Sequence, residues 1–351
     1  MTSTAAADRS SGITPDDRAI GLWLLVCCAM IFAMAVIGAI TRLTESGLSI
    51  MEWAPVSGVL PPLSQGEWER VFALYRDIPE YQEQNAGMTL AEFRTIFWWE
   101  YIHRLWGRLI GLVFLLPFLW FLLRRRVRRG LTPHLAAMFL LGGAQGGLGW
   151  FMVASGFAER TDVSQYRLVA HLGAAVLIYG YILWIALGLL LPAPAPGRPA
   201  RAGTLRAGLI AFAGLVLVTL ASGGFVAGLN AGLVYNTFPL MDGELVPGGY
   251  ARLSPWAVNL FENEIAVQFN HRVLALVTLA AALGLWLGSR RLDLAQGARS
   301  ACALLPAMAV VQVGLGVSAL LLVVPVWLGA LHQAGALLLF TLALWAIHRL
   351  R

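Results

Sequence analysis

Long apolar stretches separated by polar segments fill the chain from about residue 21 onward. A helix needs about 20 mostly apolar residues to cross the hydrocarbon core of a bilayer. Eight stretches meet this length, at about 21–40, 97–123, 133–155, 166–191, 206–229, 266–288, 301–324 and 327–348. Only helices and closed barrels satisfy their backbone hydrogen bonds in lipid. The pattern therefore predicts an all-α polytopic membrane protein with eight transmembrane helices.

Composition supports this class and excludes a soluble domain. Of the 351 residues, 58% are hydrophobic and only 13% are charged. The three cysteines, Cys27, Cys28 and Cys302, all lie in apolar stretches. We therefore expect buried thiols that pack as small apolar groups, with no disulfide in the outer loops.

The basic residues predict the orientation in the membrane. All 25 of them are arginines. Fifteen lie in segments 1–20, 124–132, 192–206, 289–300 and 349–351, whereas six lie in segments 41–96, 156–165 and 231–265. The positive-inside bias then places both termini in the cytoplasm of a bacterium, as a multi-pass protein of the inner membrane. Because these arginines flank spans and form no aromatic-rich basic face, we expect no nucleic-acid partner.

The chain contains a repeat of four spans. Residues 1–195 and 196–351 form the two halves, joined by the Pro- and Gly-rich linker LPAPAPGRPARAG. HRLWGRLIGLV matches HRVLALVTLAA, AQGGLGW matches VQVGLGV with Gln145 and Gln312 in register, and AHLGAAVLIYG matches LHQAGALLLFT. An even number of spans gives both halves the same orientation, so they should form two four-helix bundles related by a pseudo-two-fold axis along the membrane normal. The glycines of the stretch 133–155, at 142, 143, 146, 147 and 149, permit close approach of a helix or a cofactor.

Four histidines occupy corresponding positions of this repeat. His103 and His171 lie in the first half, and His271 and His332 lie in the second. We expect each within the first two turns of its helix, at the outer face. Ionisable groups in membrane spans are costly and commonly functional. Two pairs of imidazoles without an acidic or cysteine cluster suit heme iron better than a hydrolytic metal. His134 and His348 have no counterparts in the repeat and are interpreted as interfacial or capping residues.

Glu100 distinguishes the first half from the second. It precedes His103 by three residues and therefore shares its helix face, whereas Gln268 stands in the same place before His271. A carboxylate there could move a proton or stabilise a developing cation beside a bound cofactor. The alternative is a helical ion pair with Arg104, which would not exclude catalysis.

The outer segments supply further candidates. The arginines near the outer boundary that could pair with heme propionates are Arg42, Arg104, Arg108, Arg167 and Arg272; their alternative role is interfacial snorkelling. The loop 41–96 carries eight acidic residues and a stretch, WERVFALY, that predicts a short amphipathic helix on the membrane surface. This loop is a candidate lid over the first-half site.

The chain resembles the heme A synthase family. The resemblance is carried in order by TRLTESGLSIMEWAPVSGVLPP, WERVFALYRDIPEYQ, EFRTIFWWEYIHRLWGR, SGGFVAGLNAGLVYNTFPLMDG and VQFNHRVLA, followed by the last histidine. Many bacterial members carry a cysteine pair in the first outer loop, which this chain lacks. It is therefore similar to the cysteine-free alphaproteobacterial and mitochondrial-like branch.

The resemblance implies an enzyme, an oxidoreductase acting on a CH3 group. Members convert heme O to heme A, for cytochrome oxidase, by oxidising the C8 methyl to a formyl group through successive hydroxylations. It implies that His103 and His171 bind the substrate heme, that Glu100 is catalytic, and that His271 and His332 bind heme b. Heme O synthase, cytochrome oxidase assembly factors and a second copy of the chain are the expected protein partners.

Two other classes remain open. A di-heme b electron-transfer cytochrome would use the same four histidines, but it has less need of a carboxylate in one half only. A parallel-repeat transporter would place its site near the midplane of the bilayer, whereas the polar groups here gather at the outer end.

Overall fold

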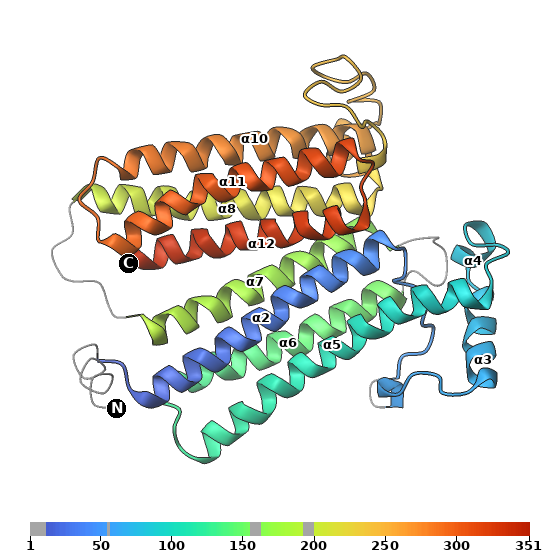
Figure 1. Ribbon diagram of the computed structural model, residues 1–351, viewed down its shortest axis with the longest axis horizontal. Coiled ribbons are helices and arrows are strands. Elements are labelled where there is room, and N and C mark those ends of the chain that lie inside the picture. Colours follow the sequence, from blue (N-terminus) through green and yellow to red (C-terminus); the bar gives the residue numbers. More distant parts are fainter. Residues whose placement is uncertain (1–11, 55–56, 155–162, 192–199) are drawn as a thin grey trace.

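Eight long helices form the body of the protein (Figure 1). The computed structural model describes residues 12–54, 57–154, 163–191 and 200–351, so the centre of the predicted linker and most of the loop after residue 154 lie outside the described residues. The long helices are α2 (Pro15–Leu43), α5 (Leu90–Leu123), α6 (Thr132–Ala154), α7 (Gln165–Leu190), α8 (Ala200–Gly228), α10 (Glu264–Ser289), α11 (Gln296–Leu321) and α12 (Val326–Arg349). All eight are long and apolar enough to cross a membrane, and no strand occurs in the described part of the chain. The predicted fold class is confirmed.

The helices pack as two rings of four. In the first ring α2 contacts α5, α5 contacts α6, α6 contacts α7, and α7 returns to α2; the second ring runs through α8, α10, α11 and α12 in the same way. Between the rings, α2 contacts α12, α7 contacts α8, and α7 contacts α12. Exchanging each helix for its counterpart turns the first of these contacts into the second. This pattern is compatible with the expected pseudo-two-fold axis.

The two ends of the bundle differ in their connections. Figure 1 shows α3 and α4 with the long connection before α10 at one end, called the loop end below. The first turn of α2 and the last turn of α12 lie at the opposite end. All three cysteines are buried and free, as expected.

Helix α5 begins earlier than the hydropathy pattern predicts. Thr89 caps its first turn through a capping box with Glu92, so the helix starts at Leu90 and not near residue 97. His103 consequently lies more than three turns into its helix, and the expectation of the first two turns is wrong for this residue. His171, His271 and His332 do lie within about two turns of their helix starts.

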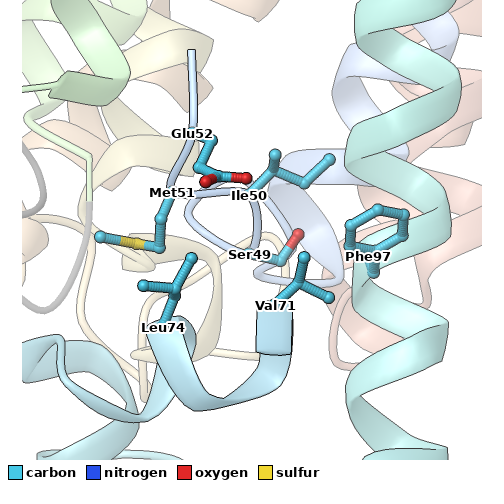
Figure 2. A pocket seen from close by; sticks show the side chains of 7 residues that line it. All are labelled: Ser49, Ile50, Met51, Glu52, Val71, Leu74 and Phe97. Carbon is cyan, nitrogen blue, oxygen red and sulfur yellow. The ribbon is translucent and has the colours of Figure 1, made fainter. Parts of the chain in front are cut away.

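The extension of α5 supports the first loop. Helices α3 (Gln65–Arg76) and α4 (Pro79–Glu83) stand beside it, and α3 includes the predicted WERVFALY stretch. The buried apolar residues of this region are Leu48, Trp68, Tyr75, Ile78, Phe93, Phe97, Tyr101 and Val163. The apolar side of α3 thus packs on protein. The segment Ser49–Glu52 lies between α3 and Phe97 of α5, as Figure 2 shows.

Neutral side chains organise the second loop. It contains the short helices η2 (Ala231–Leu233), η3 (Trp256–Val258) and α9 (Asn259–Glu262). Asn259 and Asn263 are fully buried and bond to each other at 2.8 Å. Asn259 also binds the backbone of Leu253 through both its amide atoms, and Asn263 donates to the carbonyl of Gly249. Hydrogen bonds of buried amides therefore hold this loop together, whereas packing of aromatic side chains holds the first loop together.

The glycine run of α6 adjoins open space. A Cβ added at Gly142, Gly143, Gly146 or Gly147 would meet no atom within 4 Å. Close helix packing does not account for these four glycines. The fifth, Gly149, has a different role that belongs to the site.

Candidate functional site

Each predicted ligand histidine lies against a glycine of the preceding long helix. The pairs are Gly38 with His103, Gly149 with His171, Gly223 with His271 and Gly316 with His332. A Cβ on these glycines would stand 3.3, 3.0, 3.0 and 2.8 Å from the nearest ring atom. The missing side chain therefore makes room for the imidazole. All four histidines keep partly exposed surface, so space for a further group adjoins each of them.

The second-half pair has the separation that a six-coordinate iron requires. The ring centroids of His271 and His332 are 6.2 Å apart, and their planes cross at 83°. Two metal–nitrogen bonds of about 2.0 Å each account for most of this distance, and the remainder runs from each ring centroid to its nitrogen. The two imidazoles thus fit an iron atom placed between them.

Two histidines without further protein ligands favour an iron atom whose other ligands come from a bound group. Within the described residues, no group of three or more His, Cys, Asp or Glu side chains could hold a metal ion. A porphyrin supplies four nitrogens and leaves two axial positions, which a histidine pair fills. In the first half, His103 and His171 are close enough to interact electrostatically. The structure therefore brings the four histidines together as the two predicted pairs.

A glutamine from the preceding helix holds one histidine of each pair. The amide nitrogen of Gln145 lies 3.1 Å from His171 Nδ1 and donates to the His171 carbonyl at 2.9 Å. Gln312 repeats this with His332, at 3.1 and 2.8 Å. The two glutamines that align in the sequence repeat are thus equivalent in space. The bond to the backbone carbonyl fixes each glutamine beside its histidine, but an amide nitrogen only donates and so gives Nδ1 no acceptor for a proton.

Glu100 joins the first loop to α5. The residue is 3% exposed, and one carboxylate oxygen accepts from the Ser49 hydroxyl at 2.8 Å and from the Ile50 amide at 2.7 Å. The other oxygen pairs with Arg104 at 2.5 Å. Arg104 also donates to the carbonyls of Ile50 and Glu52. The helical ion pair is therefore present, and it anchors the loop segment drawn in Figure 2.

The second half attaches its loop to α10 in the same way, with an amide in place of the carboxylate. We call each of these two attachments a joint. Gln268 donates to the carbonyls of Ala231 and Tyr235 at 2.8 and 3.2 Å, and its oxygen accepts from Arg272 at 3.2 Å. Arg272 also donates to the carbonyls of Tyr235 and Thr237. Both joints consist of the residue three before a histidine and the arginine that follows that histidine. They differ in that Glu100 accepts from the loop backbone, whereas Gln268 donates to it.

The remaining predicted arginines lie around the loop end. Arg108 donates to the Ala54 carbonyl at 3.0 Å, and the Arg167 guanidinium lies 4.6 Å from the centre of the Phe151 ring. Arg42 donates to Asn230 at 3.1 Å and so connects the two halves. These contacts give each arginine a structural role. Their binding of propionates stays a prediction.

The two unpaired histidines lie elsewhere. His134 is in the first turn of α6 and bonds to the Tyr181 hydroxyl at 2.6 Å. His348 is in the last turn of α12 with its ring edge on Trp184. One residue beside a site escaped the sequence analysis: the Ser222 hydroxyl lies 2.8 Å from His271 Nδ1.

The fold and the paired imidazoles define a helical membrane protein with two sites suited to heme. The sequence profile of the COX15-CtaA family, described as cytochrome oxidase assembly protein, matches residues 21–344. The chain is 53% identical over 338 residues to the heme A synthase of Nitrosospira multiformis, covering 95% of this chain and 94% of that protein. It is 55% identical over 349 residues to the heme A synthase of Rhodospirillum centenum, covering 99% and 92%. The chain belongs to the heme A synthase family.

Proposed function

We propose that this protein is a heme A synthase, which oxidises the C8 methyl of heme O to a formyl group by successive hydroxylations. Its product would supply cytochrome oxidase. The observation that carries the proposal is the occurrence of two histidine pairs in equivalent places, with a buried carboxylate beside only one of them. Near-complete coverage by relatives of that name supports it.

The second half would hold a resident heme b between His271 and His332. Their 6.2 Å separation and the Ser222 hydroxyl that accepts from His271 Nδ1 support this assignment. A heme with two imidazole ligands supplies one-electron transfer when bound. Arg272 lies one residue from His271 and is the second-half candidate for a propionate partner.

The first half would bind the substrate heme at His103 and His171. We assign Glu100 to this reaction because it shares a helix face with His103 and no carboxylate stands at the equivalent place of the other half. Its ion pair with Arg104 keeps a negative charge buried near the porphyrin site, where it could stabilise a developing cation. The segment Ser49–Glu52, which Glu100 holds, is the part of the loop placed to exclude water.

The alternative of a di-heme electron-transfer cytochrome predicts a different product. Membranes of cells that make heme O would contain heme A if this chain is expressed as an enzyme, and only hemes O and b if it is a cytochrome. We expect heme A in an acid–acetone extract analysed by chromatography, with cells lacking the chain as the control. An extract without heme A, from membranes in which the chain carries its heme b signal, would overturn the enzymatic proposal.

We further propose that the loop end faces outward from the inner membrane and that both termini are cytoplasmic. The excess of arginine at the opposite end supports this orientation. A topology reporter inserted after Arg126 should read cytoplasmic, and one inserted at Gln82 should read external. The reverse pattern would place both histidine pairs at the inner face and contradict the proposal.

A further inference from the structure

The four histidines are not held equally. Three of them turn Cε1 toward their glycine, with the two ring nitrogens at nearly equal distances behind it: His171, His271 and His332. His103 instead presents Nε2 and Cδ2 to Gly38, with Nε2 the nearest ring atom. The His103 ring is therefore turned differently from the other three, with Nε2 itself against the glycine; Nε2 is the nitrogen left for iron when Nδ1 donates its proton.

The hydrogen bonds of the histidines differ as well, and His271 has the most defined one. Ser222 precedes Gly223, donates its hydroxyl proton to the Thr219 carbonyl at 2.7 Å, and has its oxygen 2.8 Å from His271 Nδ1. The Thr219 carbonyl also faces that imidazole. A carbonyl can only accept, so the hydroxyl oxygen accepts from Nδ1–H. This arrangement fixes the tautomer whose Nε2 lone pair is available to iron.

The same place in the first half lacks this group. Ile37 precedes Gly38 as Ser222 precedes Gly223, and its side chain cannot accept a proton. Within the described residues, no hydrogen bond reaches either nitrogen of the His103 ring. His171, the other first-half histidine, keeps its contact from Gln145. In the described part of the chain, one histidine of the first-half pair therefore has a polar side-chain contact and the other has none.

We propose that His103 is an exchangeable axial ligand and that Ser222 is the positioning residue that makes His271 a permanent one. The proposal rests on the assignment of substrate to the first half. A substrate heme has to enter and its product has to leave, so a ligand whose tautomer no hydrogen bond fixes suits that site. A resident heme has to stay, so a ligand of fixed tautomer suits the other.

Two reciprocal variants test this difference. Ser222→Ala removes the acceptor from the second half, and Ile37→Ser installs one in the first. The measurement is the rate at which bound heme passes to an excess of apomyoglobin, followed by absorption for purified protein loaded with heme b alone or with heme b and heme O. It does not depend on turnover, so it remains informative in a chain that makes no heme A.

We expect Ser222→Ala to release heme b about 10- to 100-fold faster, which is the usual cost in metal affinity of losing such an outer partner. Ile37→Ser should release heme O about tenfold more slowly, by the same reasoning. Thr278→Val removes a hydroxyl that bonds to Thr219 and not to a histidine, and should leave both rates unchanged. Ile37→Ala controls for the lost volume and should not slow release.

Unchanged heme b release in folded Ser222→Ala would overturn the positioning role of Ser222. Equal heme O release from Ile37→Ser and Ile37→Ala would overturn the exchangeable role of His103. If Ile37→Ser does not fold, the wild-type protein still provides a test, because the proposal requires that heme O is released faster than heme b. Slower release of heme O than of heme b would contradict the proposal. A chain that follows the expected rates yet yields no heme A would contradict the proposed function alone.

Discussion

The two halves share a frame and differ in the polar groups placed on it. Glycine, histidine and arginine recur at matching places, as do Gln145 and Gln312. Where the second half has the neutral Gln268, the first has the buried carboxylate of Glu100. Among the described residues, none forms a hydrogen bond with the His103 ring, whereas Ser222 does so with His271. A change of very few side chains can thus let one half of a repeat retain its ligand while the other half converts and releases a similar one.

The outer loops show the same contrast. The second loop is organised by the buried amides of Asn259 and Asn263, whereas the first buries the carboxyl group of Glu80 against the Tyr75 hydroxyl at 2.9 Å. Burial raises the pKa of Glu80 from 4.5 to about 8. The buried carboxyl groups of the described residues, Glu80 and Glu100, therefore both lie in the half that we assign to catalysis.

Glu100→Gln should have the largest effect of the variants that sharpen this comparison. It makes the first joint resemble the second, and loss of a positioned acid–base or charge-stabilising group commonly lowers a rate about 100- to 10,000-fold. We expect heme A per heme b in membranes to fall within that range while the second-half heme is retained, with a hydroxylated intermediate accumulating. The reciprocal Gln268→Glu would set a carboxylate oxygen against the carbonyls of Ala231 and Tyr235, so we expect it to weaken heme b binding in the second half.

Limited proteolysis of the first loop separates the two roles of Glu100. An amide in place of the carboxylate weakens the contacts with Arg104 and the Ile50 amide. Ser49→Ala removes a loop contact and keeps the carboxylate, so it serves as the matched control. If Ser49→Ala and Glu100→Gln lost conversion and protease resistance in parallel, Glu100 would act only by holding the loop. Wild-type heme A ratios in Glu100→Gln would remove it from the reaction altogether.

The smallest expected effect concerns the pH dependence of the first loop. Because the folded-state pKa of Glu80 lies above its ordinary value, the folded loop binds this proton more tightly than the unfolded loop. The contribution of Glu80 to the stability of the folded loop is thus fully present below about pH 4.5 and is lost as the pH rises to about 8. The loss corresponds to at most about a tenfold change in the opening equilibrium of the loop per pH unit. Protease cleavage between residues 65 and 89 should accelerate accordingly, and Glu80→Gln should flatten the profile. Cleavage in the second loop, which buries amides, should change less over this range; equal acceleration of both loops would contradict the assignment to Glu80.

Hydropathy and repeat matching predict the parts of this fold that depend on the membrane. The eight spans, their grouping into fours and the equivalence of Gln145 and Gln312 follow from apolar length and sequence register. The early start of α5 depends on a local capping signal at Thr89 and Glu92, which an apolar threshold ignores. The glycine run of α6 reads equally as helix packing or open space, because hydropathy does not say which neighbour a face meets.

The sequence predicts the two histidine pairs of the candidate site. It does not predict most of the hydrogen bonds that hold the residues of the site in place. Histidine is rare enough in spans to stand out, so the pairs are visible in the sequence. Ser222 is a common residue whose importance depends on which side of α8 faces His271. Likewise, the ion pair of Glu100 follows from its i+4 spacing to Arg104, whereas its bonds to Ser49 and Ile50 depend on the path of the loop.

The content of heme b in single histidine variants tests the division of labour between the halves most directly. Protein purified from cells that make heme b and no heme O should carry about one low-spin heme b per chain, as one bis-imidazole site requires. His103→Ala should retain that signal, whereas His271→Ala and His332→Ala should each lose most of it. Retention of the heme b spectrum in both second-half variants, or its loss in His103→Ala alone, would contradict the account.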